Sequence, residues 1–234
     1  MAQLEFTAIE KTILSIGILT TLGSFIYEIW RRLRIVFKGK QSLPFDRFGS
    51  RLWRVFKEVF LHEKVIRGRF WPGFMHALVF WGFVVFGLVT LDHFALGFGY
   101  DLMSSQTHKL YSYIVIPFSI FVLIGIGSLT YRRFISRPKA LGKISPTSGF
   151  VALFISILMI TYLLGETNLS PAVWRVNWWI HSLIILAFLF LIPRSKHLHL
   201  VLAPINIFFK PFDIPDHTPV NIDLEGSEDE LDSM

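Results

Sequence analysis

The sequence predicts an all-α integral membrane bundle of five transmembrane helices, and two observations carry this prediction. The chain of 234 residues is 53% apolar with a mean hydropathy of +0.53, which is more apolar than a soluble domain of this length needs for its core. Several stretches also approach the roughly 20 apolar residues that a helix needs to cross a bilayer. These predicted spans lie at about 9–30, 72–93, 111–131, 149–166 and 178–200.

The positions of the basic residues predict the orientation of these spans. Twelve of the 23 Lys and Arg residues lie in residues 31–71, and five more lie in residues 131–148. By the positive-inside rule these loops are cytoplasmic, which puts the N-terminus outside and the C-terminus in the cytoplasm. The same clustering in loops between spans argues against a nucleic-acid-binding surface, because it forms no continuous basic face.

Two segments outside the spans have compositions of their own. Within the membrane domain of residues 1–210, the segment at about 40–66 mixes basic, apolar and aromatic residues. This mixture predicts a helix along the cytoplasmic interface or a docking surface, and both interpretations stay open. Residues 211–234 hold eight of the 17 acidic residues and few large apolar ones, so we expect a tail that is disordered or ordered only on a partner.

The histidines are the candidate site residues, because the sequence contains no cysteine. Without cysteine this chain holds no thiolate-bound iron-sulfur cluster and no c-type haem. His181 and His199 are 18 residues apart, which on one continuous helix is five turns and about 27 Å, so both project from one face. His76 and His93 are separated by a similar rise on a helix that runs the other way.

Two antiparallel helices with this spacing present His76 opposite His199 near the cytoplasm and His93 opposite His181 near the outer face. Paired imidazoles are ligands of low-spin haem, so the spacing predicts two stacked haems. His93 is the weakest of the four ligands, because 17 residues turn it about 100° from His76. The alternative is that these histidines form hydrogen bonds between helices. Three others are expected to be solvated: His62, His197 and His217.

The stretch WWIHSLIILAFLFLIPRSKHLHLVLAPINIFF resembles the final span of the respiratory nitrate reductase gamma subunit family, a family of b-type cytochromes. The family pattern is met by His181, Pro193, Ser195, Lys196, His199 and Pro204. The resemblance extends over residues 67–210 and implies that His76 is also a haem ligand. At the position of the remaining family ligand this sequence has Phe86, so His93 is expected to substitute for it, with His108 in reserve.

A second stretch, FMHALVFWGFVVFGLVTL, is similar to the membrane domains associated with heterodisulfide-reductase-like iron-sulfur proteins. This resemblance implies haem b as cofactor and a separate iron-sulfur subunit on the cytoplasmic side as partner. It also implies a multi-pass protein in contact with lipid in the cytoplasmic membrane of a prokaryote. The acidic tail or the basic first loop is expected to help dock that subunit.

A quinone site is expected at the outer face. A lysine before the third span lies at the quinol site of the gamma subunit family, and Lys109 has the similar place here, with His108 and Asp92 as proton relays. A lysine that only extends to the membrane surface is the alternative for Lys109. The predicted function is a cytochrome b subunit that carries electrons between quinone, with menaquinone expected, and the iron-sulfur partner. A haem-free membrane anchor for a cytoplasmic enzyme is the alternative, and a transporter ranks last.

Overall fold

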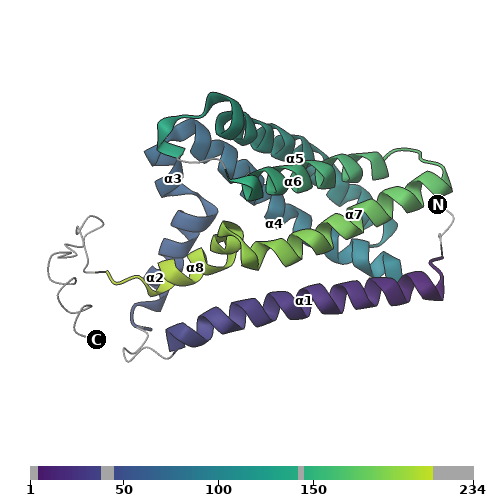
Figure 1. Ribbon diagram of the computed structural model, residues 1–234, viewed down its shortest axis with the longest axis horizontal. Helices are drawn as coiled ribbons and strands as arrows, with labels where there is room; N and C mark the ends of the chain where they lie inside the picture. The colour runs from purple at the N-terminus through teal and green to yellow at the C-terminus, as the bar shows by residue number, and fades with distance from the viewer. Residues whose placement is uncertain (1–4, 38–44, 142–144, 213–234) are drawn as a thin grey trace, which may run out of the picture.

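The computed structural model describes residues 5–37, 45–141 and 145–212, and this part of the chain contains helices and turns but no strand. Figure 1 labels the α-helices, which are joined by short π-helical and 3₁₀ segments labelled η. The elements are α1 (Ala8–Phe37), α2 (Phe48–Val55), η1 (Phe56–Phe60), α3 (Glu63–Gly68), α4 (Phe70–Phe98), α5 (Ser105–Tyr131), η2 (Arg132–Ser136), η3 (Lys139–Leu141), α6 (Pro146–Gly165), α7 (Pro171–Leu191), η4 (Ile192–Arg194), η5 (Lys196–Leu198) and α8 (His199–Phe209).

Five helices, α1 and α4 to α7, are long and apolar enough to cross a membrane, as the sequence predicts. The chain is therefore an all-α, multi-pass membrane protein. Two of these helices begin well before the predicted position, α5 by six residues and α7 by seven. The first turn of α5 is polar, and the first two turns of α7 include Arg175 and Asn177, which lower the hydropathy there. Ser104 caps α5 by accepting a hydrogen bond from the Thr107 backbone at 3.2 Å, and Pro171 begins α7, where no backbone donor is needed.

Helices α4 to α7 pack as successive neighbours, and α1 lies along α7 (Figure 1). Two glycines let α4 and α5 approach closely. A Cβ atom at Gly125 would lie 2.8 Å from the carbonyl oxygen of Met75, and one at Gly82 would collide with Val122. The core between α4, α5 and α6 holds Phe86, Val115, Val122, Met159 and Tyr162.

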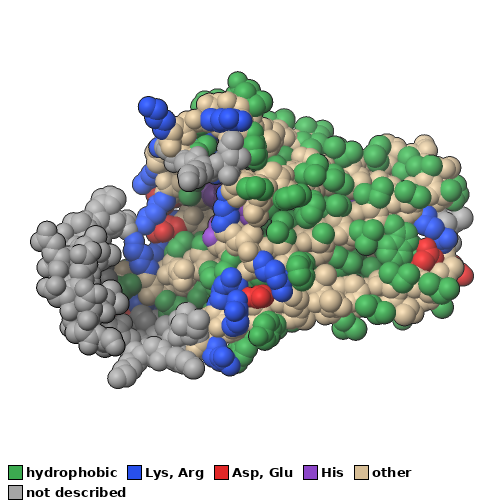
Figure 2. Space-filling model, in the orientation of Figure 1, with side chains coloured by type: hydrophobic (Ala, Val, Ile, Leu, Met, Phe, Trp, Pro, Cys, Tyr) green, Lys and Arg blue, Asp and Glu red, His purple; other side chains and the backbone are tan. Residues whose placement is uncertain are grey.

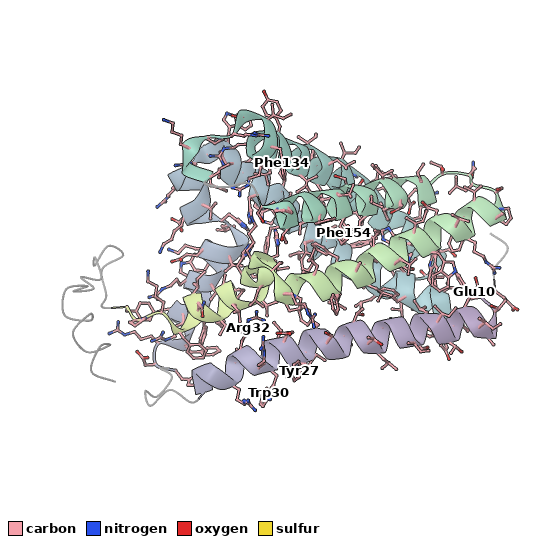
Figure 3. The ribbon with its side chains drawn as sticks, viewed as in Figure 1. Glu10, Tyr27, Trp30, Arg32, Phe134 and Phe154 are labelled. Carbon is pink, nitrogen blue, oxygen red and sulfur yellow. The ribbon has the colours of Figure 1, made fainter. Side chains whose placement is uncertain are left out.

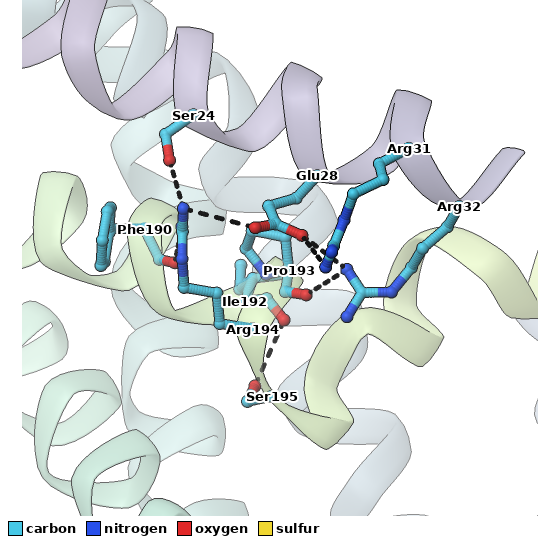
Figure 4. A network of polar contacts seen from close by, with 9 residues as sticks. All are labelled: Ser24, Glu28, Arg31, Arg32, Phe190, Ile192, Pro193, Arg194 and Ser195. Atoms are coloured by element: carbon cyan, nitrogen blue, oxygen red, sulfur yellow. Dashed lines mark hydrogen bonds and ion pairs between the residues drawn. The ribbon is translucent and has the colours of Figure 1, made fainter. Parts of the chain in front are cut away.

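Charged side chains attach the end of α1 to the end of α7 (Figure 4). Glu28 on α1 lies 3.3 Å from Arg32 and 3.6 Å from Arg194. Arg32 also donates to the carbonyl of Pro193 at 2.7 Å, and Arg194 donates to Ser24 at 2.5 Å. These contacts hold α1 at its charged end, which matters because much of its apolar surface stays exposed.

The free face of α1 carries large aromatic side chains. Figure 3 shows Arg32 between α1 and the end of α7, whereas Trp30 and Tyr27 lie on α1 with more than half of their surface exposed, at 58% and 63%. Amphipathic aromatic rings of this kind are typical of the membrane–water interface.

The fifth span is not one continuous helix to residue 200, so the five-turn alignment of His181 and His199 was wrong. Helix α7 ends at Leu191, and Ser195 has an extended backbone with φ −125° and ψ 174°. Pro193 lacks the N–H that a continuing helix needs, and the Ser195 hydroxyl accepts a hydrogen bond from the His197 backbone at 3.2 Å. The proline and the cap together end one helix and begin the next.

The segment predicted as one interfacial helix at about 40–66 is two short helices with a break at Leu61 and His62. Residues 38–44, like 213–234 of the predicted acidic tail, lie outside the described residues. Arg51 on α2 is 2% exposed and donates to the carbonyls of Phe208 and Lys210 at 2.9 and 3.1 Å. Because a cation at a helix C-terminus is favourable, this arginine fastens α2 to the end of α8.

Candidate functional site

The predicted histidine pairs form at opposite ends of the bundle. We call the end that carries α2, α3, η2 and α8 the basic end, and the end where α4 stops and α7 starts the far end. At the basic end the ring centroids of His76 and His199 are 6.1 Å apart. At the far end those of His93 and His181 are 4.8 Å apart. The sequence predicted both pairings, although the break after α7 changes how His199 reaches its partner.

At the basic end, His199 is oriented by its own turn. Its Nδ1 lies 2.8 Å from the carbonyl oxygen of Lys196. A carbonyl only accepts, so Nδ1 carries the hydrogen and Nε2 keeps a lone pair. Metal-binding histidines are commonly held by such a contact. Among the described residues, the buried Nδ1 of His76 has no hydrogen-bond partner.

A cavity of about 430 Å³ lies beside His76 at the basic end. Its wall comes from α3, the first turns of α4, the end of α5 and η2, and consists of Lys64, Val65, Gly68, Arg69, Pro72, Gly73, His76, Leu129 and Arg132. Figure 2 shows histidine side chains inside a hollow on this part of the surface, with Lys and Arg side chains around it. The basic residues favour an anionic group near His76.

His62 and His197 also lie at the basic end, and the prediction that His62 is solvated was wrong. The side chain of His62 is only 5% exposed, with its ring centroid 5.4 Å from that of His76. His197 is half-buried and lies 3.1 Å from Ser195. Burial is the largest cause that lowers the pKa of His62, and it lowers the pKa of His197 to about 4. Both rings are therefore neutral near pH 7.

At the far end, His181 is held by a chain of polar contacts across α6 and α7. Its Nδ1 lies 2.7 Å from the hydroxyl of Thr161, and that hydroxyl donates to the carbonyl of Ile157 at 2.7 Å. Because a hydroxyl has one hydrogen, Thr161 accepts from His181, which leaves the Nε2 lone pair of His181 free. Asn177 donates to the carbonyl of Thr161 at 2.9 Å and braces the contact.

The ring of His93 at the far end has a hydrogen-bond partner and an aromatic ring stacked on it. Its Nε2 lies 2.8 Å from the hydroxyl of Ser182, which itself donates to the carbonyl of Trp178. Ser182 therefore accepts from His93, and Nε2 of His93 carries the hydrogen. The indole of Trp178 stacks on the imidazole of His93 at 4.8 Å between centroids, with 14° between the planes.

The two pairs differ in how well they fit an iron between them. Two metal–nitrogen bonds of about 2 Å, with about 1 Å from each nitrogen to its ring centre, require centroids about 6 Å apart. The 6.1 Å between His76 and His199 fits this separation, whereas the 4.8 Å between His93 and His181 is too short. The described residues contain no group of three or more His, Cys, Asp or Glu side chains that suits a metal ion, but haem needs only two axial ligands.

The residues predicted for the quinone site all lie at the far end, but two are exposed and the third is buried. Lys109 and His108 are exposed in the first turn of α5. Asp92 is buried, and its Oδ1 accepts hydrogen bonds from the backbones of Leu102 and Met103 at 3.0 and 3.1 Å. The Asp92 carboxylate therefore holds the loop between α4 and α5, a role that the sequence did not indicate.

Two curated relatives match most of this chain. The Bacillus subtilis protein named probable iron-sulfur-binding oxidoreductase FadF is 28% identical in an alignment 216 residues long, which covers 79% of this chain and 30% of that protein. The EtfAB:quinone oxidoreductase of Syntrophomonas wolfei is 23% identical in an alignment 250 residues long, which covers 90% of this chain and 35% of that protein. The chain is thus similar to part of two oxidoreductases. No family model and no solved structure matches.

These matches support an oxidoreductase-related role, with electron transfer as the general activity. The chain spans about a third of the length of each relative, so the similarity does not assign the activity of either whole protein to this chain. The similarity to iron-sulfur oxidoreductases is consistent with the predicted iron-sulfur partner. Because no family model matches, the resemblance to the nitrate reductase gamma subunit family stays a prediction.

Proposed function

We propose that this chain is the membrane electron-transfer subunit of a quinone-linked oxidoreductase and binds b-type haem between His76 and His199. The observation that carries the proposal is the 6.1 Å separation of these two rings, beside a basic cavity. His93 and His181 do not fit a second haem as they are arranged, so no step is derived through one there. The proposed location is the cytoplasmic membrane of a prokaryote, with the basic end on the cytoplasmic side.

The residues at the basic end have distinct roles in this proposal. The Lys196 carbonyl fixes the Nδ1–H of His199 and leaves Nε2 for the iron. Lys64, Arg69 and Arg132 line the cavity beside His76 and supply positive charge for the carboxylates of the cofactor. Bound haem supplies one-electron transfer, and the protein holds and orients it.

The proposed electron route joins quinone to an iron-sulfur partner. The name of the Syntrophomonas relative supports quinone as substrate, with menaquinone expected, and the name of the Bacillus relative supports an iron-sulfur partner. The proposed docking place of that partner is the basic end. Lys109 and His108 are the proposed quinone contacts at the far end, where both are exposed. Asp92 stays a candidate there, although one of its oxygens already holds the neighbouring loop.

A reduced-minus-oxidised optical spectrum with pyridine haemochrome quantitation tests the haem assignment. We expect one b-type haem per chain in the purified wild-type protein, and its loss in His76→Ala and in His199→Ala. His217→Ala is the matched control, because it removes a histidine that belongs to neither pair and has no proposed role at the quinone site. Equal haem content in all four proteins would refute the assignment of these ligands.

A wild-type protein that folds without haem would refute the cofactor and favour the alternative, a haem-free anchor for a cytoplasmic enzyme. Support for this alternative is that each histidine of the far-end pair has a hydroxyl partner within the chain, Ser182 or Thr161. In that case His76→Ala would change assembly with the partner but no visible spectrum.

A further inference from the structure

His62 has a strained backbone and a buried ring, a combination that its position in a surface segment does not explain. Its φ of 52° and ψ of 29° are in the left-handed region, which costs a non-glycine residue roughly 1–2 kcal/mol. Its side chain is 5% exposed. Such conformations persist only where the surroundings impose them, and they gather at functional sites.

The surroundings of His62 fix this conformation from both sides. The π-helix η1 precedes it, and at the end of η1 the carbonyl of Phe60 accepts a 2.6 Å hydrogen bond from Trp81 on α4. The ring of His62 packs on Phe80, also on α4, with centroids 4.8 Å apart. After the turn, the carbonyl of His62 accepts from the Ile66 backbone and begins α3. π-Helical turns are frequent at functional sites.

Two buried nitrogens at this turn have no partner. Among the described residues, the Nδ1 atoms of His62 and His76 are both buried without a hydrogen bond. Their rings are 5.4 Å apart between centroids and tilted by 46°. Two imidazoles joined by an N–H···N bond of about 3 Å have centroids about 5 Å apart, and a bridging water allows somewhat more. A buried polar atom needs a hydrogen-bond partner. Each of these two Nδ1 atoms can be the partner of the other.

We infer that His62 is the positioning residue of His76: Nδ1 of His62 accepts the Nδ1–H of His76, directly or through one water, and leaves Nε2 of His76 for a ligand. The ligand role of His76 rests on the proposed function. In this arrangement the hydrogen of the neutral His62 ring lies on Nε2, because Nδ1 is the acceptor. Histidines that bind metals usually donate their second N–H in this way.

The contact between His62 and His76 affects the midpoint potential of the haem, which packing of His62 alone would not affect. An acceptor on Nδ1–H makes an imidazole a more basic ligand, and a more basic ligand favours the oxidised iron. His62→Ala removes the acceptor, so the midpoint potential of the haem rises. His62→Asn places an amide oxygen close to the position of Nδ1, and asparagine tolerates the left-handed backbone. The asparagine variant therefore restores a potential near that of the wild type.

The experiment is an optical redox titration of wild type, His62→Ala, His62→Asn and the control His217→Ala. We expect haem content near wild type in all four, a raised potential in His62→Ala only, and wild-type behaviour in the others. An unchanged potential in His62→Ala overturns the inference while the haem assignment stands. Loss of haem from both His62 variants, with the fold retained, also overturns it, because His62 would then be a ligand itself.

A second measurement does not depend on haem. In the full chain labelled with ¹⁵N-histidine, NMR shifts of the ring nitrogens report which one carries the hydrogen. The inference expects hydrogen on Nδ1 of His76 and on Nε2 of His62, and the His76 signal moves in His62→Ala. Hydrogen on Nδ1 of His62 refutes the inference. A wild-type protein without haem refutes the proposed function, and this measurement still decides the role of His62.

Discussion

The two ends of the bundle use paired histidines in different ways. At the far end, His93 and His181 are only 4.8 Å apart, and hydroxyl groups of Ser182 and Thr161 take up one nitrogen of each ring. At the basic end, the rings of the pair are 6.1 Å apart, next to a cavity of about 430 Å³ lined with basic residues. Each ring of the far-end pair has one nitrogen hydrogen-bonded to a hydroxyl group, whereas the buried Nδ1 of His76 at the basic end has no partner among the described residues.

If the proposed function is right, hydrogen-bond partners, more than residue type or depth, separate a packing histidine from a ligand in this bundle. A buried polar group without a partner costs about 1–3 kcal/mol. The far end avoids that cost with Ser182 and Thr161. The basic end leaves Nδ1 of His62 and of His76 without partners in the described residues, and the inferred contact between these two nitrogens offsets such a cost. Each prediction below tests whether the two ends are as different as these contacts indicate.

The largest expected effect is at Gly73, where α3 crosses the first turn of α4. A Cβ atom there would lie 2.5 Å from the carbonyl oxygen of Val65, and backbone does not move as easily as a side chain. Gly73→Ala therefore displaces α3, which lines the cavity beside His76. The displacement costs about 1–3 kcal/mol, so the affinity for haem falls by about ten- to a hundredfold. Haem titration of the variant measures this change.

Gly87→Ala is the matched control for Gly73→Ala. Both glycines are on α4, but a Cβ atom at Gly87 would meet nothing within 4 Å. This variant should bind haem like the wild type and gain up to about 1 kcal/mol of stability, because alanine is the better helix former. Equal haem affinity in the two variants would show that the basic-end cavity is not the binding site.

The sequence predicts the spans and the pairing of histidines, because both depend on distances along helices. Hydropathy detects five apolar stretches, and the spacing of His76 and His93 is preserved in the single helix α4. The pairing of His199 with His76 was right for a different reason from the one proposed. The chain breaks after Leu191 and then turns, instead of continuing for five turns.

The role of His62 was not predictable from the sequence, because it depends on tertiary contacts. Its neighbours in sequence are basic and aromatic, a composition that indicates an interface. Burial of His62 comes from the π-helix before it, the hydrogen bond from Trp81 and the close approach at Gly73. A glycine three residues before His76 was the available sign, but one glycine has many explanations.

At the far end, Thr161→Val tests whether His181 is only a packing residue. Valine has the shape of threonine but no acceptor, so the buried N–H of His181 loses its partner, at a cost of about 1–3 kcal/mol. Thermal unfolding in detergent should show this loss, with haem content unchanged. Thr12→Val is the control, because Thr12 also bonds its own helix but is exposed and not hydrogen-bonded to a histidine. Loss of haem from Thr161→Val would mean that the far-end pair holds a cofactor after all.

The smallest effect is expected for Asp92→Asn. The asparagine oxygen can accept the same two backbone hydrogen bonds from Leu102 and Met103, so stability should change by less than about 1 kcal/mol. Asp92→Ala removes the acceptor and should cost about 2 kcal/mol, which shows that the assay detects the loop. If Asp92 serves only the loop, quinone-linked turnover of the assembled complex stays near wild type in Asp92→Asn. A large loss of turnover with normal stability would instead make the carboxylate a proton relay, and the far end would then have a chemical role as well as a packing role.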